Sequence, residues 1–405
     1  MERTRAAPLE KQLSELLSEP LEAARERSRT AFDREVGAFK NRFVLFGGGN
    51  MGRRVLARLR QDGIEPLAFS DNQSSQWGEA IDGLDILPPR DAVARFGSDA
   101  VFVVTIYNNR HSFPDTRTQL LNLGCRKVIS IIPLRWKYWE SFLPYFRDDL
   151  PHKVLLEADA IHRAFSLWSD EPSRREFVAQ VAWRLHGDFD VLGAPDAEQE
   201  YFPEDLFRFT GDDLIVDVGA FDGDTIRRFL KLRGNEFRGI VALEPDPENF
   251  GKLSRYVSEL PVEVSAKIEL HELAAASHAG RVRFAGGEGV ASAVGNTGSI
   301  EVSCVRLDDL LAASHPTYIK MDVEGAEPDA IEGCTRILNE ERPILAACVY
   351  HAQDHLWNIP IALSRITQDH HVFLRPHMPE CWDTVCYAVP HGRSIGAEGF
   401  SVRPC

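Results

Sequence analysis

This chain of 405 residues lacks the sequence features of membrane-spanning, secreted and nucleic-acid-binding proteins. Its longest apolar runs, such as 101–107 and 344–350, are too short to span a bilayer, so no transmembrane segment is expected. The first 30 residues alternate Glu with Arg and lack the apolar segment of a signal peptide. Lys and Arg number 46 against 61 Asp and Glu, a formal net charge of −15, whereas nucleic-acid binding needs a basic surface. Nucleic acid is therefore not an expected partner.

The chain has few cysteines, and their spacing does not form a paired motif. The seven cysteines are odd in number and include no C-x-x-C pair, which favours reduced, buried thiols and a cytoplasmic location. Cys381 and Cys386 are close in sequence, but no matching second pair exists for a zinc site. We expect them to be buried structural thiols.

Apolar and charged contents of 44% and 26% are ordinary for a globular protein, and the length suits two or three domains. Strands alternate with helices in two stretches, so the predicted class is α/β, with two doubly wound, Rossmann-like domains joined by a helical connector. The predicted strands lie at 42–46, 100–107, 127–132, 214–218, 239–243, 266–270, 317–321, 344–350, 371–375 and 384–389. The predicted parts are a helical segment (1–40), a nucleotide or nucleotide-sugar domain (41–135), a connector (136–210) and a second α/β domain (211–405). The glycine-rich run 286–289 is expected to be a loop.

The first glycine turn follows the strand 42–46 and has the spacing G-x-G-x-x-G. Asp71 ends the next strand, 22 residues beyond Gly49, which completes the dinucleotide-binding pattern in its strand–turn–helix context. The residues of this predicted second nucleotide site are Gly47, Gly49, Asn50, Met51, Gly52 and Asp71. No Tyr-x-x-x-Lys set for hydride transfer follows. Residues 69–89 resemble the small nucleotide-sugar-binding domains found ahead of sugar acyltransferases. Three readings stay open: a nucleotide-sugar site, a scaffold that has lost its ligand, and redox use of NAD.

The second glycine turn, LIVDVGAFDGDTIRRFL (214–230), is the most informative segment. A buried strand leads into a loop with Gly219 and Gly223, and an amphipathic helix follows. Glycine lets a nucleotide approach the backbone and the first N–H groups of the helix. The loop carries three Asp and neither Lys nor Arg, so it suits naked phosphates poorly. A cation with ribose hydroxyls, such as the sulfonium S-adenosylmethionine, fits better.

Two further acidic positions end neighbouring strands. Glu244 lies 27 residues after Asp217, at the end of the next strand. A carboxylate at this position can accept hydrogen bonds from both hydroxyls of a ribose diol. Asp322 is followed closely by Glu324 and Glu327, and three carboxylates so close together repel unless something positive lies near. They could cap a helix, or they could contact the sulfonium and amino end of the cofactor, a metal, or an acceptor hydroxyl.

Methyl transfer to a neutral hydroxyl needs alignment and a nearby base. His351, directly after the strand 344–350, is the favoured base, and Asp322 is the second candidate. Alternatively, Asp322 and Glu324, with His351, could hold Mg²⁺ to acidify the hydroxyl. Tyr201 could cover the cofactor or could pack in the core.

These segments together resemble the FkbM-type family of S-adenosylmethionine-dependent methyltransferases over roughly residues 199–390. The resemblance is carried by YFPEDLFRFTGDDLIVDVGAFDGDT, LEPDPENF, VRLDDL, YIKMDVEGAEPDAIEG, VYHAQDHLWNIP and FLRPHMPECWDTVCYAV. It implies a class I methyltransferase fold for the second domain and transfer to a hydroxyl, often on a sugar or polyketide. By this match the cofactor turn includes Asp217, Gly219 and Gly223, Glu244 binds the ribose, and Asp322 and Glu324 form the reaction edge.

The residues expected to bind cofactor are Tyr201, Asp217, Gly219, Ala220, Phe221, Asp222, Gly223, Glu244, Pro245, Asp246 and Glu324. The expected activity is O-methylation of a sugar or polysaccharide-precursor hydroxyl, with a small-molecule or glycan acceptor as partner. The alternatives are an NAD-dependent nucleotide-sugar oxidoreductase that uses the first domain, and a non-catalytic nucleotide-sugar-binding protein. The oligomeric state is left open.

Overall fold

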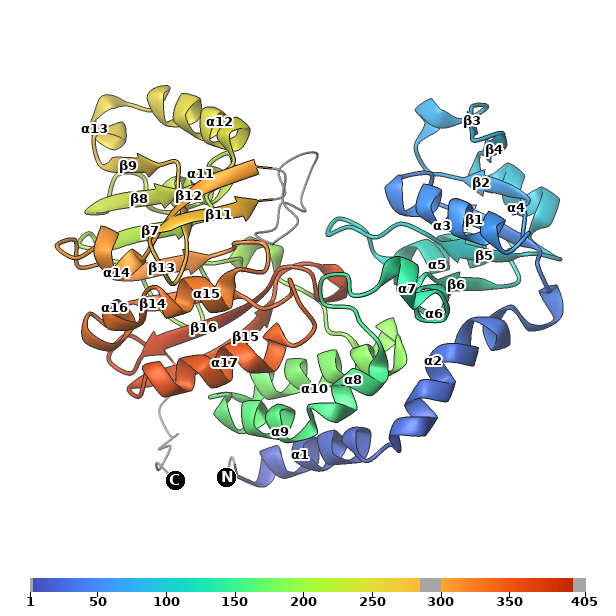
Figure 1. The fold of residues 1–405 in the computed structure, drawn as a ribbon, viewed down its shortest axis with the longest axis horizontal. Coiled ribbons are helices and arrows are strands. Elements are labelled where there is room, and N and C mark those ends of the chain that lie inside the picture. The colour runs from blue at the N-terminus through green and yellow to red at the C-terminus, as the bar shows by residue number, and fades with distance from the viewer. Residues whose placement is uncertain (1–2, 285–299, 396–405) are drawn as a thin grey trace.

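The computed structural model describes residues 3–284 and 300–395, and the chain folds into two α/β lobes bridged by helices (Figure 1). The glycine-rich run 286–289 lies outside the described residues. The α/β class with two predominantly parallel sheets agrees with the sequence prediction. The bounds of the domains stay a prediction.

The first lobe is built on a six-stranded sheet in the order β3-β4-β2-β1-β5-β6, in which only the β3·β4 pair is antiparallel. Its strands are β1 (Phe43–Phe46), β2 (Ala68–Ser70), β3 (Ala80–Ile81), β4 (Leu84–Leu87), β5 (Val101–Val104) and β6 (Val128–Ser130). Its helices are α3 (Asn50–Gln61), α4 (Pro89–Phe96), α5 (Phe113–Asn122), α6 (Ile132–Lys137) and α7 (Trp139–Phe142), with a short 3₁₀ turn η2 (Ser74–Gln76). Strands β1 and β5 are buried along their whole length because helices cover both faces of the sheet.

The second lobe is built on a seven-stranded sheet in the order β15-β16-β14-β13-β7-β8-β9. Its strands are β7 (Leu214–Val218), β8 (Gly239–Leu243), β9 (Ile268–His271), β13 (Tyr318–Met321), β14 (Ile344–Cys348), β15 (His370–Pro376) and β16 (Thr384–Pro390). Its helices are α11 (Asp224–Arg233), α12 (Pro247–Ser258), α13 (Val262–Ser265), α14 (Leu307–Leu310), α15 (Glu327–Glu332), α16 (Thr335–Glu340) and α17 (His355–Ile366), and η5 (Pro379–Cys381) precedes β16. Strand β16 is antiparallel to both of its neighbours, and the others are parallel. The strand order reverses between β7 and β13, which is where open α/β sheets bind ligands.

A small three-stranded sheet, absent from the sequence prediction, lies beside this second sheet (Figure 1). Strand β12 (Ile300–Val305) pairs in parallel with β10 (Ala274–Ala275) and antiparallel with β11 (Gly280–Phe284). Strand β10 is only two residues long, whereas β11 and β12 alternate polar and apolar residues, a strand pattern that the sequence prediction did not use.

Helices join the lobes along the base of the molecule. They are α1 (Arg3–Leu17), α2 (Leu21–Val36), α8 (Pro151–Leu156), α9 (Ala158–Leu167) and α10 (Glu171–His186), with 3₁₀ turns η1 (Gly37–Phe39), η3 (Phe189–Val191) and η4 (Ala197–Gln199). The N-terminal segment α1 packs on α9 and α10, whereas α2 packs on α6 and α8. The N-terminal helices therefore contact both the connector and the first lobe.

Most of the predicted strands form within one or two residues of their expected bounds. The strand expected at 100–107 ends three residues early, at Val104, and the strand expected at 266–270 begins two residues late, as β9. The helical segment expected over 1–40 is divided at Pro20, where the chain is extended. In the connector expected over 136–210, the helices α8 and α9 meet at Glu157.

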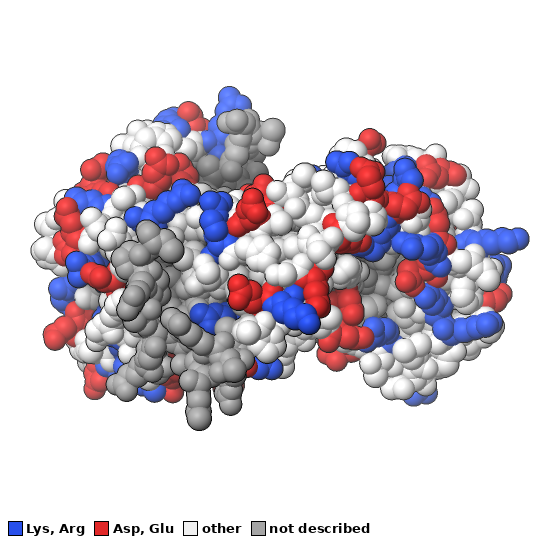
Figure 2. Space-filling model, turned by 90° about the horizontal axis from the view of Figure 1, so that it is seen from below, with Lys and Arg blue, Asp and Glu red and all other residues white. Residues whose placement is uncertain are grey.

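On the face shown in Figure 2, the described Lys and Arg side chains are interspersed with Asp and Glu. Within residues 3–284 and 300–395, no helix has both the length and the apolar character needed to cross a membrane. The six cysteines in the same ranges are unpaired and buried.

Candidate active site

A cavity of about 300 Å³ opens at the carboxyl ends of β7, β8 and β13. This volume lies at the lower end of the range for small-molecule sites. Its lining residues are Asn109, Arg110, Glu200, Tyr201, Val218, Gly219, Phe221, Asp224, Thr225, Glu244, Pro245, Asn249, Leu273, Ala274, Ala275, Lys320, Asp322, Val323, Glu324, Ala326, Tyr350 and Asp383. Six of these are carboxylates, so the cavity favours a cationic ligand.

The turn after β7 is shaped by Gly219, whose φ is +80°. A Cβ atom at this position would lie 1.9 Å from the carbonyl oxygen of Asp322. The N–H groups of Gly219 and Ala220 both donate to the carbonyl oxygen of Leu243, at 2.9 Å. Only glycine permits this turn to pass so close to the end of β13.

A buried ion pair lies beneath the turn. The register of β7 and β13 places Lys320 opposite Asp217, and its Nζ lies 3.1 Å from Oδ1 of that residue. Nζ also donates to the carbonyl oxygen of Gly219 at 2.6 Å. Burial raises the pKa of Asp217 to about 6 although Lys320 opposes the rise. Burial would lower the pKa of Lys320, but Asp217 outweighs it and the pKa lies above its ordinary value. The sheet therefore holds a lysine cation directly under the cofactor turn.

Glu244, at the end of β8, is held by two backbone N–H groups. Phe221 donates to its Oε2 at 2.8 Å, and Asp246 donates to its Oε1 at 2.9 Å. Burial raises the pKa of Glu244 to about 7 against these two hydrogen bonds. Each carboxylate oxygen accepts one hydrogen bond and retains a further lone pair, and Glu244 lines the cavity, so it can accept from a ribose diol.

This raised pKa gives a testable pH dependence. As the pH falls through about 7, Glu244 takes up a proton and loses the charge that strengthens hydrogen bonds from hydroxyl groups. We expect the dissociation constant of adenosine to be about tenfold higher at pH 6 than at pH 8. Adenosine is the probe because it has the ribose diol but no amino-acid group that titrates in this range. Isothermal titration checks the change, and Glu244→Gln should bind equally weakly at both pH values.

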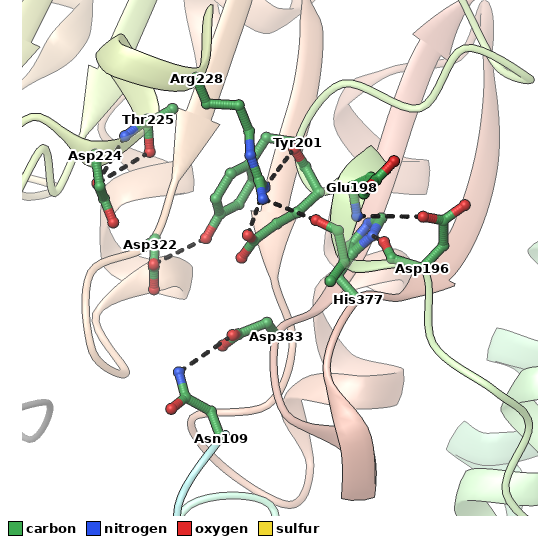
Figure 3. A network of polar contacts seen from close by, with 12 residues as sticks. Asn109, Asp196, Glu198, Tyr201, Asp224, Thr225, Arg228, Asp322, His377 and Asp383 are labelled. Atoms are coloured by element: carbon green, nitrogen blue, oxygen red, sulfur yellow. Dashed lines mark hydrogen bonds and ion pairs between the residues drawn. The ribbon is translucent and has the colours of Figure 1, made fainter. Parts of the chain in front are cut away.

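Asp322, directly after β13, belongs to a polar network in which its carboxylate faces the hydroxyl of Tyr201 (Figure 3). The hydroxyl of Tyr201 donates to its Oδ2 at 2.9 Å, and Nε2 of His351 lies 3.3 Å from its Oδ1. Tyr201 is itself fixed, because its N–H donates to the hydroxyl of Tyr387 and its carbonyl oxygen accepts from Tyr318. One oxygen of the carboxylate is thus held by a hydrogen bond, the other faces the ring of His351, and Asp322 lines the cavity.

His351 lies behind Asp322, with its side chain 1% exposed. Its Nδ1 lies 2.7 Å from Oε1 of Glu327, and its Nε2 lies 3.6 Å from Oε2 of Glu324. Burial opposes a charge on the ring, but Glu327, Glu324 and Asp322 together raise the pKa of His351 to about 10. Burial would raise the pKa of Glu327, yet the attraction of His351 and its hydrogen bonds from His351 and His355 hold it well below the ordinary value. At neutral pH this arrangement favours an imidazolium between carboxylates.

Donor atoms of Asp322, Glu327 and His351 lie within 4.8 Å of one another. Asp322 faces Nε2 and Glu327 faces Nδ1, so the imidazole ring itself lies between the two carboxylates. Glu324, the second predicted magnesium ligand, also faces Nε2, and burial raises its pKa to about 8. The Mg²⁺ site stays a prediction.

The structure brings about half of the predicted cofactor residues to the cavity. Those that line it are Tyr201, Gly219, Phe221, Glu244, Pro245 and Glu324, whereas Asp217, Ala220, Asp222, Gly223 and Asp246 do not. Of the two predicted candidate bases, Asp322 lines the cavity and His351 does not. Asp222 forms an ion pair with Arg227. Asp246 caps α12 by accepting from the N–H groups of Glu248 and Asn249. These two carboxylates therefore already have structural partners.

In the first lobe, packing accounts for most of the glycine pattern. A Cβ at Gly47 would lie 2.5 Å from the side chain of Ile106, and one at Gly52 would lie 2.0 Å from the carbonyl oxygen of Gly47. Asp71 accepts from the N–H groups of Gly48 and Gln73. Gly49 and Asn50 are exposed and Met51 is buried. The nucleotide role of this turn stays a prediction.

Sequence reasoning missed several cavity residues: Asn109, Arg110, Glu200, Lys320, Tyr350 and Asp383. Lys320 had a detectable signal, since a lysine inside the apolar strand YIKM needs a buried partner. No sequence signal indicated Asn109 and Arg110, because they belong to the first lobe and most of the lining comes from the second.

Residues 217–381 match the family model described as the Methyltransferase FkbM domain. The C-terminal half holds a methyltransferase FkbM domain. The matched residues contain Gly219, Glu244 and Asp322, so the match includes the glycine turn after β7, the acidic end of β8 and the carboxylate after β13. This agrees with the family that the sequence motifs indicated for this half.

Individual relatives extend the comparison. The 2-O-methyltransferase NoeI of Sinorhizobium fredii (strain NBRC 101917 / NGR234) is 31% identical over a match that covers 32% of this chain and 61% of that protein. The chain thus spans about three fifths of the length of this curated relative. The crystal structure of methyltransferase FkbM from Methylobacillus flagellatus KT superposes with a TM-score of 0.73 at 22% identity, and covers 91% of this chain and 98% of that one. Coverage of 91% extends through both lobes, so they share the fold of that structure, including its class I methyltransferase sheet.

Proposed function

We propose that this protein transfers the methyl group of S-adenosylmethionine to a hydroxyl oxygen of a sugar or polysaccharide precursor. One observation carries the proposal: the glycine turn, the ribose-type carboxylate Glu244 and the oriented carboxylate Asp322 line a single cavity within the FkbM domain. The 2-O-methyltransferase relative supports oxygen as the methylated atom.

The donor set fits S-adenosylmethionine. Glu244 can accept from both ribose hydroxyls, the Gly219 turn lets the ligand approach the backbone, and the carboxylates of the cavity suit a sulfonium charge. When bound, S-adenosylmethionine supplies an activated methyl group for in-line displacement. The protein's own task is to hold the acceptor oxygen in line and to remove its proton.

Asp322 is the base that the geometry favours. It lines the cavity, Tyr201 donates a hydrogen bond to its Oδ2, and Nε2 of His351 lies 3.3 Å from its Oδ1. His351, the base favoured by sequence, lies behind Asp322, where a charged ring would hold the carboxylate in place but would have no free lone pair for a proton. We therefore assign proton acceptance to Oδ1 or Oδ2 of Asp322, and a positioning role to His351.

Titration of the purified protein with S-adenosylmethionine tests the proposal. Glu244→Ala should weaken binding about 10- to 100-fold, because hydrogen bonds to a charged carboxylate are lost. Glu248→Ala, on the neighbouring exposed turn of α12, is the matched control and should bind normally. The proposal fails if S-adenosylmethionine does not bind the native protein. Binding of NAD instead would favour the oxidoreductase alternative.

A further inference from the structure

One wall of the cavity is formed by residues of the first lobe. The loop between β5 and α5, residues 105–112 (the β5–α5 loop), contributes Asn109 and Arg110 to the lining. The loop is anchored at its start, because the hydroxyl of Thr105 donates to the carbonyl oxygen of Gly47 at 2.8 Å. It therefore begins beside the first glycine turn and ends at the methyltransferase cavity.

The loop is docked against the turn that precedes β16. Nδ2 of Asn109 donates to Oδ2 of Asp383 at 3.4 Å (Figure 3). The N–H of Phe113, just beyond the loop, donates to the buried carboxylate of Glu380 at 2.5 Å. Glu380 and Asp383 have φ values of 60° and 47°, which are costly for residues other than glycine. Contacts from the first lobe thus help to hold Asp383 at the edge of the cavity.

Charge distinguishes Arg110 from the rest of the lining. Two cations line the cavity, and Lys320 is paired with Asp217. The side chain of Arg110 is exposed and has no hydrogen bond, ion pair or ring contact with any other residue in 3–284 or 300–395. A guanidinium group without a protein partner, at the rim of a ligand cavity, can form two hydrogen bonds with a phosphate or carboxylate of the ligand.

We propose that the β5–α5 loop selects the methyl acceptor and that Arg110 binds an anionic group, a phosphate or a carboxylate, on the acceptor sugar. This rests on the proposed function, since it takes the cavity as the site of methyl transfer. Asn109 and Asp383 lie on the same wall, and their polar atoms can bind the sugar hydroxyls. Arg110 is a specificity residue in this scheme and takes no part in proton removal.

The test uses the full chain saturated with S-adenosylhomocysteine and three probes: glucose 1-phosphate, glucuronate and glucose. We expect ligand-observed NMR titration to give dissociation constants at least about tenfold lower for an anionic probe than for glucose. Comparison of the two anionic probes tells phosphate from carboxylate. Arg110→Gln should abolish the difference, and Arg110→Lys should restore part of it.

Arg34→Gln removes one exposed arginine charge from α2 and is the matched control, which should retain the preference. Equal binding of all three probes by the native protein, or an unchanged preference in Arg110→Gln, would overturn the proposal. So would the absence of binding by every probe. Failure of S-adenosylhomocysteine to bind would instead count against the methyltransferase function itself, so the two failures are distinguishable.

Discussion

Replacement of Asp322 by asparagine is expected to lower kcat about 10²- to 10⁴-fold, the usual range for loss of a general base. The affinity for S-adenosylmethionine should change little, because Glu244 and the Gly219 turn are untouched. Asparagine has the same shape, and its side-chain oxygen can still accept from the hydroxyl of Tyr201. Release of S-adenosylhomocysteine, measured with a sugar that the native protein methylates, gives kcat, and isothermal titration gives the cofactor affinity.

Two further variants separate the base from the groups that orient it. Tyr201→Phe and His351→Gln each remove one contact to Asp322 and leave the carboxylate in the cavity. We expect both to lower kcat by less than Asp322→Asn does. If His351→Gln abolished turnover while Asp322→Asn retained most of it, the base would be His351, as the sequence favoured.

Replacement of Lys320 by methionine is expected to destabilise the second lobe by about 3–5 kcal/mol at pH 8, because Asp217 would remain as a buried, unpaired charge. The pKa of Asp217 is already raised to about 6 by burial, and it should rise further without the lysine. At pH 5.5 the carboxyl group would then fold in its neutral form, so the loss should be smaller than at pH 8. Urea unfolding at both pH values measures the difference.

The double variant Lys320→Met with Asp217→Leu is the control for this pair. It removes both charges and should recover much of the lost stability, since an apolar pair of similar volume can replace a buried ion pair. Recovery will be partial because the carbonyl oxygen of Gly219 also loses its donor. A single variant as stable as the native protein at pH 8 would show that the ion pair contributes little to the lobe.

The sheets could be predicted because their strands are short apolar runs bounded by glycine, proline or acidic residues. The carboxyl ends of parallel strands meet at one edge, and this placed Asp217, Glu244 and Asp322 together in advance. The pairing of Lys320 with Asp217 could not be predicted in the same way, because it depends on the register of two strands about 100 residues apart. The spacing of residues in the sequence predicts which residues end the strands, but it does not predict the register in which the strands pair.

The orientation of the loop side chains could not be predicted from the sequence either. Asp222 lies between Phe221 and Gly223, two residues with positive φ, and its side chain turns toward Arg227 instead of the cavity. The approach of Asn109 to Asp383 spans 274 residues and joins two lobes. No local pattern encodes that contact, since it depends on how the connector helices set one sheet against the other.

The close approach of Gly219 to the carbonyl oxygen of Asp322 has a consequence for how such an enzyme can diversify. The turn proposed to receive the methyl donor lies against the backbone of the residue proposed as the base, so a shift of one would move the other. On this proposal, the spacing between donor and base is set by the contact of Gly219 with the backbone of Asp322. The β5–α5 loop comes from the other sheet and does not take part in that contact. If the loop selects the acceptor, as we propose, its residues can change with the acceptor while the contact between Gly219 and Asp322 is kept.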